Sequence, residues 1–77
     1  MKIGDKIQIT EDCHAGSVDW WKKGHIYEVT NCGETKEPNG RPYVYFSLKK
    51  KNGDTNGWDS RAVKYIVLGQ EINCEIY

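Results

Sequence analysis

The chain has 77 residues, enough for one domain, and its eleven basic residues balance its eleven acidic ones. This balance disfavours a dedicated polyanion-binding protein, which needs many lysine and arginine contacts to phosphate. Because the sequence shows no membrane-length apolar run, no signal-peptide pattern and only three cysteines, we expect a cytoplasmic protein with reduced thiols and a single domain over residues 1–77.

The first half of the chain contains two predicted strands. Residues 6–10 alternate polar and apolar side chains, and residues 25–30 do the same. Residues 11–23, between them, contain glycine, serine and aspartate, which discourage regular structure. Residues 31–41 contain glycine and proline and are predicted to form a second loop.

The clearest strand signal covers residues 42–48. Period-two alternation places Val44, Phe46 and Leu48 on one face and Tyr43, Tyr45 and Ser47 on the other. Asn52-Gly53 follows and predicts a hairpin with a type I′ turn, in which both residues adopt positive φ. Residues 55–58 are the expected returning strand, and Asn56-Gly57 suggests a bulge within it.

The last third predicts a short turn and two further strands. Residues 59–62 resemble one helical turn capped by Asp59 or Ser60, and residues 63–67 form the fifth strand. Residues 71–76 alternate again and predict a sixth strand. This strand either closes the sheet within a monomer, which we favour, or pairs with a second copy in a homodimer.

Together these elements predict an all-β fold. The expected architecture is a small SH3-like barrel of five to six short antiparallel strands with one 3-10 or single helical turn. Closure suits so short a chain because it removes open sheet edges, which promote aggregation.

Several segments resemble small phage and bacterial SH3-like proteins. The resemblance lies in residues 1–10, in 21–29, in Asn52-Gly53-Asp54 with Trp58, and in 61–66. It implies a phage or mobile-element accessory protein that contacts a host or phage protein, in the host cytoplasm if phage-encoded. These are turn and core residues, so they indicate fold rather than activity. The chain lacks the peptide-binding stretches of eukaryotic SH3 domains, so recognition of proline-rich ligands is not implied.

The sequence does not favour catalysis or a cofactor. Cys13 and His14 are adjacent, and neighbouring side chains of an extended segment point apart, so they are not expected to form a dyad. Cys13, His14, His25 and Cys32 lack the paired spacing of a structural zinc site. We therefore predict a non-enzymatic protein without a metal.

A protein partner is the favoured prediction, and it rests on the first loop. Trp20 and Trp21 are adjacent, so in an extended chain one ring should be at least partly exposed. Beside nearby carboxylates, such a ring would make an anchor for a partner. The alternative is that both rings cap the core. The predicted partner-binding residues are Trp20, Trp21, Glu11, Asp12 and Asp19.

Nucleic acid is the alternative partner. Tyrosines on the outer face of the 42–48 strand, with cations at both strand ends, could stack bases and contact phosphates. The residues of this alternative are Tyr43, Tyr45, Lys49, Lys50, Lys51 and Arg41.

Overall fold

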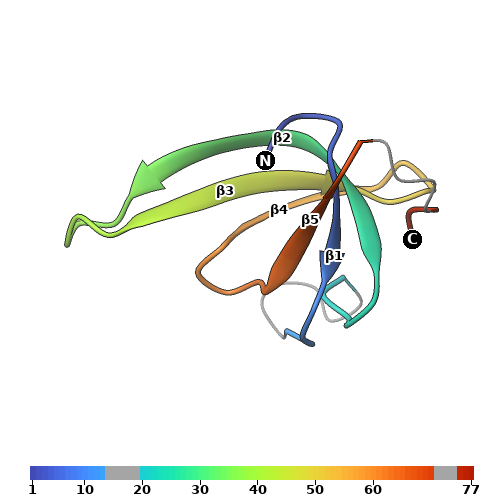
Figure 1. Ribbon diagram of the computed structural model, residues 1–77, viewed down its shortest axis with the longest axis horizontal. Helices are drawn as coiled ribbons and strands as arrows, with labels where there is room; N and C mark the ends of the chain where they lie inside the picture. The colour runs from blue at the N-terminus through green and yellow to red at the C-terminus, as the bar shows by residue number, and fades with distance from the viewer. Residues whose placement is uncertain (14–19, 71–74) are drawn as a thin grey trace.

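The alternating segments of the sequence form one antiparallel sheet. The computed structural model describes residues 1–13, 20–70 and 75–77 (Figure 1). Within these ranges there are five strands and no helix, and the strand order is β4-β3-β2-β1-β5. The strands are β1 Lys6–Ile9, β2 Ile26–Lys36, β3 Pro42–Lys49, β4 Thr55–Asp59 and β5 Tyr65–Gly69. The all-β prediction is confirmed, but the sheet is not closed into a barrel, because no pairing joins β4 to β5 in the described part.

The core lies between β1, the first half of β2 and the second half of β3. Because side chains alternate between the two faces of a strand, every second residue of each strand points into the core. Apolar side chains from three strands therefore meet there. The buried apolar residues are Ile7, Ile9, Trp20, Trp21, Tyr27, Val29, Phe46, Leu48 and Val63.

Both tryptophans belong to this core, so the expectation of an exposed ring is wrong. The exposed fraction is 7% for Trp20 and 0% for Trp21. The reason is that the pair lies in a turn rather than in an extended strand, so the two side chains do not point to opposite faces. The Tyr27 hydroxyl donates to the Trp20 carbonyl, and the Cys13 N–H donates to the Trp21 carbonyl over 2.9 Å.

The loop predicted at residues 31–41 is confined to residues 37–41, because β2 continues to Lys36. Its partner β3 pairs with it along this whole length, and the two strands project from the core as a ribbon (Figure 1). We call residues 31–45 the arm. Every arm residue is at least partly exposed, so the arm extends past the core rather than covering it.

The arm ends in a tight hairpin turn. The Gly40 N–H donates to the Glu37 carbonyl over 2.8 Å, and the Glu37 N–H donates to the Arg41 carbonyl over 2.9 Å. Gly40 has a φ of 86°, which only glycine adopts without strain. This is the three-residue hairpin in which a type I turn is followed by a glycine in the left-handed region.

The second hairpin repeats this turn. The Gly53 N–H donates to the Lys50 carbonyl over 3.0 Å, and the Lys50 N–H donates to the Asp54 carbonyl over 2.8 Å. Asn52 does not have positive φ, so the predicted type I′ turn is wrong. The predicted bulge at Asn56-Gly57 is also absent, because the β3–β4 register runs unbroken. In β2 the register instead shifts between Val29 and Asn31.

Residues 59–62 form a hydrogen-bonded turn. The Ala62 and Val63 N–H groups both reach the Asp59 carbonyl, over 3.4 and 3.2 Å, but the turn is too short to count as a helix. The fifth strand begins two residues later than predicted, at Tyr65. Most of the predicted sixth strand, with Ile72 and Cys74, lies outside the described residues, and residues 75–77 are not in a strand.

Candidate binding groove between the arm and the turn after β4

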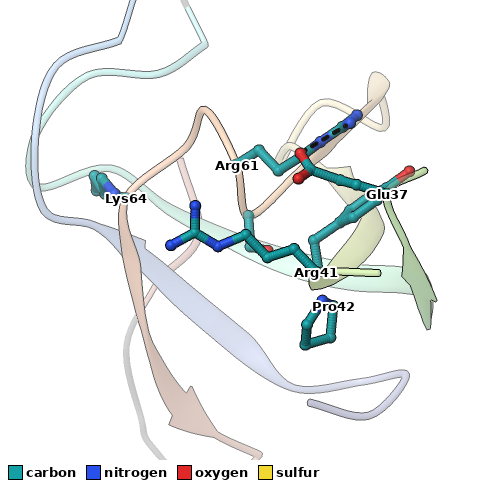
Figure 2. A pocket seen from close by; sticks show the side chains of 7 residues that line it. Glu37, Arg41, Pro42, Arg61 and Lys64 are labelled. Atoms are coloured by element: carbon teal, nitrogen blue, oxygen red, sulfur yellow. Dashed lines mark ion pairs between the residues drawn. The ribbon is translucent and has the colours of Figure 1, made fainter. Parts of the chain in front are cut away.

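A groove with a volume of about 390 Å³ lies where the arm meets the turn after β4 (Figure 2). The pairing of β3 with β4 sets Tyr45 opposite Asp59, and this register brings residues 60–64 beside the start of β3. We call this the Tyr43 groove. It is lined by Glu37, Arg41, Pro42, Tyr43, Ser60, Arg61 and Lys64.

Arg61 holds one wall of the groove in place. Its guanidinium donates to both carboxylate oxygens of Asp59, over 3.1 and 2.8 Å, and lies 3.6 Å from the Glu37 carboxylate. The same guanidinium lies over the Tyr43 ring, 3.9 Å from its centroid. The hydrogen bonds from Arg61 lower the pKa of Asp59, and Asp59 in turn raises the pKa of Arg61. These contacts connect the turn after β4 with Glu37 at the tip of the arm and with Tyr43 near the start of β3.

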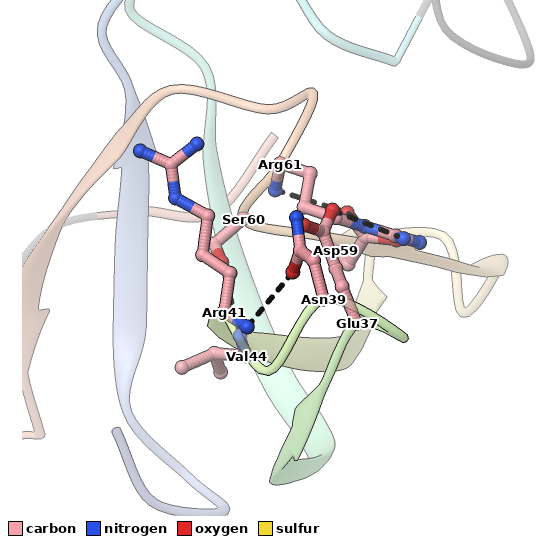
Figure 3. A network of polar contacts seen from close by, with 7 residues as sticks. All are labelled: Glu37, Asn39, Arg41, Val44, Asp59, Ser60 and Arg61. Atoms are coloured by element: carbon pink, nitrogen blue, oxygen red, sulfur yellow. Dashed lines mark hydrogen bonds and ion pairs between the residues drawn. The ribbon is translucent and has the colours of Figure 1, made fainter.

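Ser60 fixes the opposite side of the junction (Figure 3). Its backbone N–H donates to the Val44 carbonyl over 2.8 Å, and its hydroxyl oxygen accepts from the Val44 N–H over 3.0 Å. Because the hydroxyl oxygen is an acceptor in this pair, its proton is left to donate to another group.

Two cations of the groove have no ion-pair partner in the described part of the chain. These are Arg41 and Lys64, whereas Arg61 is bound by two carboxylates. The Arg41 backbone N–H donates to the Asn39 side-chain oxygen over 2.9 Å, which orients the residue (Figure 3). The Arg41 guanidinium extends toward the Lys64 side of the groove (Figure 2). With Glu37 and Asp59 counted against three cations, the site carries one net positive charge. It can therefore accept a carboxylate or another small anion.

The predicted acidic and tryptophan loop does not form an aromatic surface. Glu11 and Asp12 are exposed, but Trp20 and Trp21 are buried in the core, and Asp19 lies outside the described residues. One Asp12 carboxylate oxygen accepts from the Lys23 N–H over 2.7 Å. The partner-binding role of these five residues stays a prediction, now without an exposed ring to support it.

The structure divides the residues of the nucleic-acid alternative. Arg41 and Tyr43 meet in the Tyr43 groove, whereas Lys49 lies at the other end of β3, about 20 Å from Tyr43 along an extended strand. The three lysines also have partners: Lys49 pairs with Glu28 at 3.5 Å, Lys51 pairs with Glu75 at 3.6 Å, and the Lys50 ammonium lies 4.5 Å from the centre of the Trp20 ring.

Tyr45 is the exposed aromatic residue of the arm, with an exposed fraction of 44%. It lies opposite Gly33 on β2, and its ring fills the space that a side chain at position 33 would need. A glycine within a strand often marks such a close approach. Tyr45 therefore rests on the outer face of the arm, beside but not within the Tyr43 groove.

Sequence reasoning missed Glu37, Pro42, Ser60, Arg61 and Lys64. No local pattern joins residues 60–64 to the arm, because their contact depends on the β3–β4 register and on a β2 strand that was read as a loop. The Asp59 and Arg61 pair, two residues apart on a predicted turn, is the one local signal that could have indicated a fixed guanidinium.

The described cysteine and histidine residues that were considered for catalysis or metal binding do not form a cluster. His25 is stacked on Tyr77, with ring centroids 3.6 Å apart, and its Nδ1 lies 3.0 Å from the Tyr27 hydroxyl. His14 lies outside the described residues. Among residues 1–13, 20–70 and 75–77, no group of three or more metal-binding side chains comes together, and no helix is long and apolar enough to cross a membrane.

Comparison of the chain with protein-family models, with curated proteins and with solved structures found no match.

Proposed function

We propose that the chain is a non-catalytic binding module, with an SH3-like arrangement of strands, that contacts another protein through the Tyr43 groove. The observation that carries this proposal is the pair of cations, Arg41 and Lys64, which line a groove beside an ordered aromatic ring and have no ion-pair partner in the described part of the chain. Charged groups on rigid elements give a binding site its specificity.

The strand arrangement supports the SH3-like part of the proposal. Five short antiparallel strands of the described residues lie in one sheet, and β1 lies between β2 and β5, so β5 returns beside the first strand. Nine buried apolar side chains of the described ranges form the core, and they include the large aromatic residues Trp20, Trp21 and Tyr27. A small β-fold whose interior is filled in this way leaves its outer surface for contacts.

The charges around the groove favour protein over nucleic acid. Glu37 lines the groove and Asp59 lies behind Arg61, so a phosphate backbone would meet carboxylates as well as cations. The lysine-rich hairpin that would continue such a contact lies at the far end of β3. Protein ligands carry single carboxylates, which suit two cations in a small groove.

A pull-down from cell extract tests the proposal with charge-reversing variants. Arg41→Glu and Lys64→Glu should each lose the bound proteins that the unchanged chain retains. The matched control is Lys23→Glu, which makes the same charge change at an exposed position outside the groove. Circular dichroism would establish that all three variants are folded. Equal recovery of every band by the chain and its two groove variants would refute the groove.

A labelled oligonucleotide tests the nucleic-acid alternative. That alternative predicts binding at low salt that weakens steeply as salt rises, and that is reduced by Tyr45→Ala and by Lys50→Glu. Our proposal expects no binding at micromolar protein. The phage or mobile-element origin and the host-cytoplasm location stay predictions from the resemblance.

A further inference from the structure

Three cations without an ion-pair partner in the described part of the chain lie around the Tyr43 groove. Arg41 and Lys64 line it, and the Arg41 guanidinium extends toward the Lys64 side (Figure 2). Lys36 lies opposite the lining residue Pro42 in the β2–β3 register, and opposite residues of an antiparallel pair project from the same face. All three cations are exposed, so a ligand can reach them from solvent.

The carboxylates near the groove are fewer than the cations. Glu37 and Asp59 both contact the Arg61 guanidinium, at 3.6 and 2.8 Å. Glu34 lies opposite Val44, at the next depression, about 7 Å along β2 from the cation that faces Pro42. The described cations around the groove are Lys36, Arg41, Arg61 and Lys64. Set against the two carboxylates that contact Arg61, they leave an excess of two positive charges.

The groove also offers three kinds of hydrogen-bond donor. The Arg41 guanidinium presents a planar fork of N–H groups, and the Lys64 ammonium is a compact charge with rotatable N–H donors. The Ser60 hydroxyl oxygen accepts from the Val44 N–H over 3.0 Å, so its own proton can be donated to a ligand. Figure 3 shows the Ser60 side chain beside that of Arg41.

A phosphate monoester matches this set of charges and donors. On a serine, threonine or tyrosine side chain it carries about −1.5 to −2 charges at neutral pH and three strong acceptor oxygens. A carboxylate carries one charge, and so does each phosphodiester of a nucleic acid. The cations lie around one groove of about 390 Å³, and the lysine-rich hairpin is at the far end of β3. This placement favours one isolated phosphate over a phosphate backbone.

We propose that the Tyr43 groove binds the phosphate group of a phosphorylated side chain in the protein partner. Arg41 binds phosphate oxygens with its fork, Lys64 supplies a second charge, and the Ser60 hydroxyl donates to a further oxygen. Lys36 adds its charge from the adjacent strand. This inference rests on the proposed function and names the chemistry by which the partner is recognised.

The test uses three capped peptides with phosphoserine, glutamate or serine between flanking alanines. Titration of the phosphoserine peptide into the isotope-labelled chain should shift the amide signals of Arg41, Ser60 and Lys64. Its dissociation constant should be about tenfold lower than that of the glutamate peptide, because a second charge strengthens the hydrogen bonds. The serine peptide should not bind. Inorganic phosphate should displace the phosphoserine peptide, since the phosphate group itself is recognised.

The pH dependence of binding separates the two anions. The phosphate gains its second charge near pH 6, whereas glutamate is already ionised above about pH 4.3. Raising the pH from about 5 to about 7 should therefore tighten binding of the phosphoserine peptide about fivefold and leave the glutamate peptide unchanged. No described histidine lines the groove; its charged and titratable groups are Lys36, Arg41, Tyr43, Arg61 and Lys64 with Glu34, Glu37 and Asp59.

Neutral variants test whether the groove is the phosphate site. Arg41→Gln and Lys64→Gln should each weaken binding of the phosphoserine peptide about tenfold. Arg41→Lys keeps the charge but loses the fork, so it should weaken binding about threefold. The matched control is Lys23→Gln, which removes an exposed cation outside the groove and should leave binding unchanged.

Absence of amide shifts with the phosphoserine peptide, or equal affinity for the phosphoserine and glutamate peptides, would overturn the inference. So would displacement of the phosphoserine peptide by an oligonucleotide without terminal phosphates, since its phosphates are all diesters.

Phosphatase treatment of the extract separates this inference from the proposed function. Bands that depend on Arg41 and Lys64 in the pull-down should disappear after the treatment. If these bands persist, the groove still binds a protein and the phosphate inference fails. Where the pull-down does not depend on the two cations, both fail.

Discussion

The two halves of the β2–β3 ribbon share one hydrogen-bonded ladder but differ in what covers them. In the core half, Tyr27 and Val29 on β2 and Phe46 and Leu48 on β3 are buried. In the arm, residues 31–45, every side chain keeps some contact with solvent. The register shift between Val29 and Asn31 lies at the boundary between the two halves.

The difference shows that strand pairing and burial are separate sources of order. A two-stranded ribbon is marginal in water by itself. In this molecule the arm is braced along its β3 side, because Ser60 forms two hydrogen bonds with the Val44 backbone and Arg61 bridges Glu37, Tyr43 and Asp59. The arm thus has limited stability of its own, as binding regions often do. The contacts of Ser60 and Arg61 nevertheless hold its groove residues in place.

The largest expected effect comes from truncating the core half of β3. Phe46→Ala should cost about 3–5 kcal/mol of unfolding free energy, which is comparable to the whole stability of so small a domain. Val44→Ala, two residues away on the same face, should cost about 1 kcal/mol because Val44 is only partly buried. Urea unfolding measures both. Similar losses of unfolding free energy in the two variants would contradict the distinction between core and arm.

Alkaline pH should lower the free energy of unfolding through two tyrosines that pack in or against the core. Burial raises the pKa of the Tyr27 phenol, with a further contribution from Tyr77, and burial also raises that of Tyr65. The unfolded chain loses these protons near pH 10 while the native chain keeps them, so stability is complete below pH 10 and falls above it. The fall should approach about 1.4 kcal/mol per pH unit for Tyr27, and Tyr65 should add to it in the same direction.

Unfolding measured across this pH range in the chain and in Tyr27→Phe checks the assignment. The variant should retain only the part of the slope that belongs to Tyr65. A slope identical in both proteins would show that Tyr27 is not responsible.

The smallest expected loss of stability comes from substitutions in the two hairpin turns, which have the same hydrogen bonding. In each, an asparagine side chain accepts from a backbone N–H over 2.9 Å: Asn52 from Asp54, and Asn39 from Arg41. Replacing either by alanine removes one hydrogen bond, worth about 1 kcal/mol. Asn52→Ala should lower global stability by about that amount, whereas Asn39→Ala should mainly accelerate amide hydrogen exchange within the arm.

Hydrogen exchange followed residue by residue separates these outcomes. If Asn39→Ala accelerates exchange in β1 as much as in the arm, the arm unfolds together with the core and the two halves form one cooperative unit.

The sequence predicted the strands where burial imposes alternation. β1, β3 and β4 begin and end within about two residues of expectation, because Ile7, Phe46 and their neighbours alternate against one core. The far half of β2 was missed because Gly33 and Pro38 are typical of loops. Their roles here depend on a partner strand: Gly33 makes room for the Tyr45 ring, and Pro38 lies in a hairpin turn.

The groove was predictable only in part. Arg41 and Tyr43 were identified from their place on the 42–48 strand, although for a different ligand. Ser60, Arg61 and Lys64 become neighbours of that strand through the β3–β4 register, which no local pattern reveals. The tryptophan pair was misjudged for a related reason: the direction of its side chains follows from a turn that folds over the core, and this is a tertiary feature.

The close approach of Gly33 to Tyr45 has a consequence for how this protein can diversify. Any larger residue at position 33 would have to displace the Tyr45 ring, which supplies the nearest atoms to a side chain built there. A single substitution at this position would therefore change the aromatic surface that the arm presents to solvent.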